Sequence, residues 1–148
     1  MERDAESTCT LIAGGETYRG KQGFDYFAGL SAETAGTKAL CMHLVTIPPG
    51  GRARPHLHQR HESAVYVVSG VAGMWYGEGL RQHMWAHAGD FIYIPANTPH
   101  LPYNASDMVP CVGLIARTDP HEQESVTVVD IPDPGVAGAA EGPGAGGG

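Results

Sequence analysis

GGRARPHLHQRHESAVYVVSG, residues 50–70, is the stretch that decides the fold. It begins with two glycines, continues through a His-x-His pair and ends in a run of β-branched and aromatic residues before another glycine. Side chains alternate along a strand, so His56 and His58 point to the same face. Two imidazoles that converge on one face make half of a metal site, although taken alone the pair could equally face solvent.

A second stretch, GDFIYIPANTPHLPYN at residues 89–104, combines an apolar strand, a tight turn and a lone histidine. Together the two stretches resemble the two conserved motifs of the cupin superfamily. The first motif is matched by Gly50, His56, His58, Glu62 and Gly70, with seven residues instead of six between the glutamate and the last glycine. The second is matched in every spacing by Gly89, Pro95, His100 and Asn104. Asn97 replaces the turn glycine, and asparagine tolerates the left-handed backbone better than most residues.

The resemblance implies an all-β fold, a single cupin double-stranded β-helix or jelly-roll-like barrel, with one divalent metal ion near its mouth. Short β-branched and aromatic runs broken by Gly and Pro favour the same class. The predicted strands are Thr8–Ile12, Ala39–Ile47, Ser63–Val68, Ala72–Tyr76, Phe91–Ile94, Cys111–Ala116 and Val126–Ile131. We expect residues 1–134 to form the cupin domain. Residues 135–148 are rich in Gly and Ala and contain no aromatic residue, which predicts a disordered tail.

The metal ligands implied by the motifs are His56, His58 and His100, and a fourth comes from the neighbouring His61 and Glu62. Counting forward from His58 places Glu62 in the acidic ligand position. Counting back from Gly70 places Ser63 there, and His61, two residues earlier, would then share the metal-facing side. We favour the set of four histidines and keep Glu62 as the alternative ligand, or as the catalytic base if it does not bind the metal.

Composition limits the classes of function. The net charge of -7 and only nine basic residues argue against a nucleic-acid partner. No apolar run is long enough to cross a bilayer, and the charged N-terminus lacks the pattern of a signal peptide, so we expect a cytoplasmic protein. The three cysteines include no CxxC pair, which favours free thiols. A homodimer is expected because barrels of this size usually bury a sheet edge or face.

Among small cupins the chain is most similar to the zinc-dependent polyketide cyclases of aromatic antibiotic pathways, the resistomycin type in particular. That resemblance implies aldol-type ring closure of a polyketide intermediate, with the metal as Lewis acid; zinc is favoured, and iron or manganese would also fit. We expect Trp75, Trp85 and Tyr93 to line the substrate pocket. The alternatives are a non-haem iron dioxygenase using His56, His58, Glu62 and His100, and a metal-stabilised binding module for a small molecule.

Overall fold

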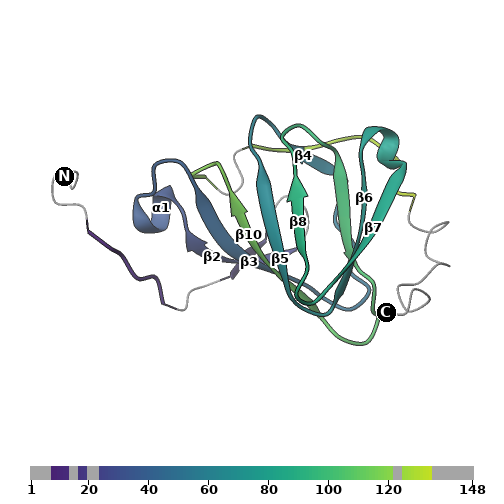
Figure 1. Ribbon diagram of the computed structural model, residues 1–148, viewed down its shortest axis with the longest axis horizontal. Helices are drawn as coiled ribbons and strands as arrows, with labels where there is room; N and C mark the ends of the chain where they lie inside the picture. The colour runs from purple at the N-terminus through teal and green to yellow at the C-terminus, as the bar shows by residue number, and fades with distance from the viewer. Residues whose placement is uncertain (1–7, 14–16, 20–23, 122–124, 135–148) are drawn as a thin grey trace.

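The structure, a computed structural model, describes residues 8–13, 17–19, 24–121 and 125–134, so the predicted tail at 135–148 lies outside the described residues. Two antiparallel sheets make up most of the described fold and form the walls of a barrel (Figure 1). The all-β, jelly-roll-like barrel predicted from the sequence is therefore confirmed. None of the described helices has the length and apolar character that crossing a membrane requires.

The first sheet contains six strands in the spatial order β1-β2-β3-β10-β5-β8. These strands are β1 (Thr17–Arg19), β2 (Asp25–Leu30), β3 (Cys41–Ile47), β10 (Cys111–Arg117), β5 (Ser63–Ser69) and β8 (Phe91–Ile94). Alternating burial along β3 shows that one face of this sheet is turned to the interior and the other to solvent. Non-consecutive neighbours, such as β3 beside β10, bring distant parts of the chain into one wall.

The second sheet contains five strands in the order β11-β4-β9-β6-β7. They are β11 (Val126–Val128), β4 (His56–His58), β9 (His100–Asn104), β6 (Val71–Tyr76) and β7 (Gln82–His87). Both cupin-like motifs contribute to this sheet, because β4 follows the first glycine pair and β9 follows the second turn. The two short helices, α1 (Ala32–Ala35) and η1 (Glu78–Leu80), lie outside the sheets.

Apolar side chains from both sheets fill the space between them. Val67 and Ile92 come from the first sheet, Met74 and Ala86 come from the second, and each is less than a tenth exposed. A separate apolar cluster covers the opposite face of the second sheet and includes Leu80, Leu101 and Tyr103. The barrel therefore has one interior core and one external cluster, on the two faces of the same sheet.

The structure corrects several predicted strand positions. Residues 8–12 form no strand, and Leu11 is 85% exposed, because these residues have no neighbouring strand with which to pair among the described ones. Strand β11 ends at Val128 rather than at Ile131. The predicted strand ranges omit β1, β2, β4, β7 and β9, although the alternation of His56 and His58 already implied an extended segment at β4. Strands β4 and β9 lack the usual run of β-branched residues.

Candidate metal centre

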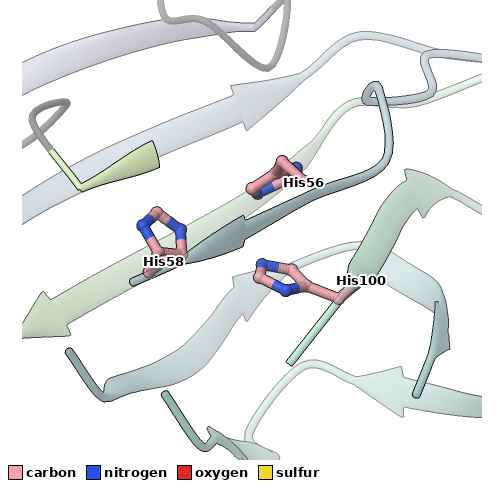
Figure 2. A group of neighbouring side chains, drawn as sticks. All are labelled: His56, His58 and His100. Carbon is pink, nitrogen blue, oxygen red and sulfur yellow. The ribbon is translucent and has the colours of Figure 1, made fainter. Parts of the chain in front are cut away.

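Three histidines from the two motifs meet inside the barrel. His56 and His58 lie on β4, and His100 begins β9, where its Cα is paired with that of His56. Figure 2 shows the three rings turned toward a common space from these two strands. One nitrogen of each ring lies within 4.8 Å of the others, and all three side chains are buried. The predicted convergence of these three residues is thus present in the structure.

Backbone carbonyls orient two of the rings. The Nδ1–H of His56 donates to the Arg54 carbonyl and that of His100 donates to the Thr98 carbonyl, each at 2.8 Å. A histidine whose Nδ1 carries the proton presents the lone pair of Nε2, which is the usual arrangement of a metal-binding imidazole. The Nδ1 of His58 is buried and makes no hydrogen bond with the described residues. It is a buried polar atom that a bound ion or water would satisfy.

The turn of the second motif holds these strands in place. Asn97 adopts a φ of 62°, the left-handed conformation expected of the residue that replaces the turn glycine. Its N–H donates to the His58 carbonyl, and its side-chain oxygen accepts from the N–H of Arg60. Asn104, the last residue of the motif, is buried and donates to the carbonyls of Ile47 and Val109. Asn97 therefore joins the turn of the second motif to the end of β4, and neither asparagine lines the cavity at the histidines.

Burial keeps the three imidazoles neutral. It lowers the pKa of His100 to about 4 and lowers the pKa values of His56 and His58 well below 6.5, with the positive charge of Arg117 lowering all three further. Metals bind the neutral form of imidazole, so no proton has to leave these rings at neutral pH. Three neutral nitrogen ligands in a buried site, two of them oriented by backbone carbonyls, fit a divalent transition-metal ion such as zinc or iron.

The structure brings neither predicted fourth ligand to this cluster. The Nδ1 of His61 lies 3.5 Å from an oxygen of Asp119. Glu62 is exposed and accepts a hydrogen bond from the hydroxyl of Tyr93 at 2.9 Å, which is the main cause of the raised Tyr93 pKa. Because His61 precedes β5, strand alternation does not carry it to the inner face with Ser63. Ligation by either residue would require movement, so the fourth ligand and the role of Glu62 as a base stay predictions.

The register of β5 instead places Ser63 inside the barrel. Ser63 is 2% exposed, and its hydroxyl accepts a hydrogen bond of 2.8 Å from Nε of Arg117. Sequence reasoning did not single out Arg117. The sequence pattern that could have identified it is the alternation along the apolar run that starts at Cys111, because every second residue of that run faces inward.

The aromatic residues expected in the pocket lie elsewhere. Trp75 and Trp85 belong to the external cluster on the second sheet, where their rings flank His83 at centroid distances of 4.5 and 4.4 Å. Their neighbours Met74 and Met84 face inward instead, because adjacent side chains on a strand point in opposite directions. Tyr93 is 61% exposed on the outer side of the first sheet. None of the three lines the cavity beside the histidines, so a role in substrate binding stays a prediction for them.

That cavity measures about 80 Å³ and has largely apolar walls. Its polar side chains are the three histidines, Ser63 and Arg117, and its described lining includes no aspartate or glutamate. It would accept a few water molecules or a small group. The arrangement can bind one metal ion and a small ligand and can shield both from bulk water.

Comparison with known proteins identifies the family of this chain and solved structures that share its fold. The family described as "Cupin domain" matches residues 43–116, a segment that contains all three histidines. No curated protein matches the sequence significantly.

Three solved structures illustrate the fold. Oxalate decarboxylase from Bacillus subtilis at pH 4.6 is 23% identical, with a TM-score of 0.66 over 78% of this chain and 30% of that one. The formate complex of the Lactobacillus farciminis enzyme is 20% identical, with a TM-score of 0.63 over 80% and 33%. A Bacillus subtilis enzyme with Mn(II) centres is 21% identical, with a TM-score of 0.65 over 86% and 34%. This chain thus spans about a third of their length, and the likeness is one of fold.

Proposed function

Because the chain belongs to the cupin family, we propose that it is a metal-dependent enzyme acting on a carbonyl compound, and that its reaction is the aldol-type ring closure of a polyketide-like chain. The observation that carries the proposal is the ligand set, since three neutral imidazoles converge and no carboxylate from the described residues joins them. A divalent cation bound there would keep its full positive charge and supply Lewis-acid polarisation of a carbonyl oxygen.

The chain's own residues would bind the metal ion, orient its ligands and shield the reacting group from water. His56, His58 and His100 provide nitrogen ligands, and the carbonyls of Arg54 and Thr98 hold two of these rings in position. The apolar walls exclude water and so lower the local dielectric around a reacting group. Orientation and the exclusion of water favour ring closure, because the reaction joins two carbons of one chain that must be held close together. The reaction also needs a base to take the proton from the attacking carbon, and Glu62 is the residue predicted for that role.

The size of the cavity restricts how such a chain would bind. Pockets that enclose a drug-sized ligand measure roughly 300–1,000 Å³, whereas the space beside the histidines is about 80 Å³. A polyketide-like substrate would therefore place only its reacting end among the histidines. The remainder would lie against the barrel opening or the outer surface.

The iron dioxygenase is the weaker alternative. The ligand set expected for a dioxygenase includes Glu62, which is exposed and accepts a hydrogen bond from the hydroxyl of Tyr93. The identity of the metal is a separate question, because an all-imidazole set suits zinc as well as iron and the neighbouring Bacillus subtilis structure contains Mn(II). We favour zinc, and elemental analysis of protein purified without added metal would identify the ion.

The activity test uses a synthetic linear poly-β-ketone thioester and follows the absorbance of the aromatic product. We expect ring closure that depends on stoichiometric metal, is lost on removal of the metal with a chelator and is absent in His56→Ala. His87→Ala is the matched control, because His87 lies outside the cluster with 41% of its side chain exposed. Cyclisation at the wild-type rate in metal-stripped protein would refute the proposal. Tight metal binding without turnover would favour a binding module.

A further inference from the structure

The outer face of the first sheet is apolar, although antiparallel sheets that face water on one side normally place polar residues there. The outward positions of four neighbouring strands, β3, β10, β5 and β8, carry mostly aliphatic and aromatic side chains (Figure 1). A contiguous exposed apolar face of this kind marks an interaction surface. We propose that this face binds a second copy of the chain and forms a two-fold symmetric dimer. The proposal goes beyond the proposed function and does not depend on it.

Strand pairing arranges the outward residues in two rows that run across the sheet. The first row, here called the hollow row, consists of Met42, Ala116, Ala64 and Tyr93. Its two central residues are alanines, whose short side chains leave the surface low. Both alanines line a surface hollow of about 370 Å³, which Leu40 also borders.

The second row, here called the ridge row, consists of large side chains: Leu44, Leu114, Tyr66 and Phe91. The rings of Tyr66 and Phe91 contact each other at a centroid distance of 4.9 Å, and Phe91 is 78% exposed. The two rows are two residues apart along each strand, a spacing of about 7 Å. A ridge of large side chains therefore lies beside a hollow of similar length on one face.

Two-fold symmetry would fit these two rows to each other. An axis that lies in the plane of the face, between the rows and parallel to them, exchanges the ridge row of one copy with the hollow row of the other. Tyr66 of one copy then packs over Ala64 of the second copy, and Leu114 packs over Ala116. Facing sheets interdigitate in this way, and a two-fold interface has to be self-complementary.

The exposed area of this face is sufficient for a dimer. Its residues that are more than a third exposed include Leu40, Met42, Val68, Phe91 and Tyr93. Together they offer on the order of 600 Å² of apolar surface in each copy. Two copies would therefore bury about 1,200 Å², which reaches the size of specific protein interfaces.

Charge also favours a second copy over a membrane surface. The chain carries a net charge of -7, so two copies repel each other least where they meet through an uncharged face. Neither the hollow row nor the ridge row contains a charged residue. Attachment to a membrane surface usually relies on Lys and Arg beside the apolar residues, and the two rows contain neither.

Analytical ultracentrifugation over a series of protein concentrations tests the proposal. We expect the wild type to sediment with twice the mass of one chain, and Phe91→Glu to raise the dimer dissociation constant at least about thirtyfold. Met108→Glu is the matched control, because Met108 is 82% exposed and lies outside both rows. It should dimerise like the wild type. A wild type that stays monomeric, or a Phe91→Glu variant that dimerises equally well, would overturn the proposal, and so would a monomer that binds lipid vesicles.

Exchanging a large and a small residue tests the fit of the two rows. Ala64→Tyr fills the hollow and should weaken the dimer, because Tyr66 of the second copy would meet a ring there. The double variant Ala64→Tyr/Tyr66→Ala swaps ridge and hollow and should dimerise more tightly than Ala64→Tyr alone. A double variant no tighter than the single one would refute this packing. Circular dichroism should show wild-type folding for the single variant, since Ala64 is exposed beside the hollow.

Discussion

Acidification of the metal-free protein should cause a large loss of stability, because the barrel buries several neutral histidines. Burial lowers the pKa of His100 to about 4 and that of His43 to about 3, from 6.5. Below pH 6.5 the unfolded chain therefore binds protons that the folded chain excludes. The contribution of these histidines to the free energy of unfolding is fully present above this pH and decreases as the pH falls. It stops decreasing only below the folded-state pKa values.

The magnitude follows from linkage. Each such histidine contributes a slope of roughly 1.4 kcal/mol per pH unit, so acidification to about pH 5 costs about 2 kcal/mol for each group. His43 and His100 together then lower the free energy of unfolding by about 4 kcal/mol, and His56 and His58 act in the same direction. A domain of this kind is typically stable by about 5–15 kcal/mol, so the metal-free protein should approach unfolding near pH 5.

Urea denaturation in the presence of a chelator, at a series of pH values from about 8 to about 5, measures this loss. His100→Gln should reduce the loss between the same two pH values by about 2 kcal/mol, whatever its effect on stability at neutral pH. Zinc-loaded protein should lose less, because bound metal competes with protons for the same nitrogens. A free energy of unfolding that changes by less than about 1 kcal/mol over this range would refute the assignment of buried neutral histidines.

Two further predictions concern substitutions. A Cβ added to Gly73 would overlap the ring of Tyr103, so Gly73→Ala should cost about 1–3 kcal/mol in thermal or chemical unfolding. Gly113→Ala, whose Cβ would meet Val65 at an ordinary 3.5 Å, should change stability much less, and equal costs would contradict the packing described. His61→Ala and Glu62→Gln should each retain the metal content of the wild type by elemental analysis. Loss of metal in either variant would restore that residue to the ligand set.

The fold and three members of the metal site were predictable from the sequence because both depend on local patterns. His56 and His58 are two residues apart on one strand, and alternation alone puts them on one face. His100 follows a turn whose geometry is set by nearby residues, including Asn97 with its left-handed backbone. The orientation of Trp75 and Trp85 was not predictable, since alternation fixes opposite faces for neighbours without stating which face is inward.

The residue at the fourth position of the cluster was not predictable because it depends on the register of β5. Counting from His58 and counting from Gly70 predict registers that differ by one residue. One extra residue precedes Gly70, and the pairing of β5 with β10 shifts by one residue between Val67 and Ser69, while Ser63 takes the inward place. The residue at this position also contacts β10, a strand that is distant in the sequence. The serine hydroxyl at that place accepts a hydrogen bond of 2.8 Å from Nε of Arg117, at the end of β10. The same one-residue difference therefore places a serine, in place of an acidic ligand, at the inward position beside the three histidines.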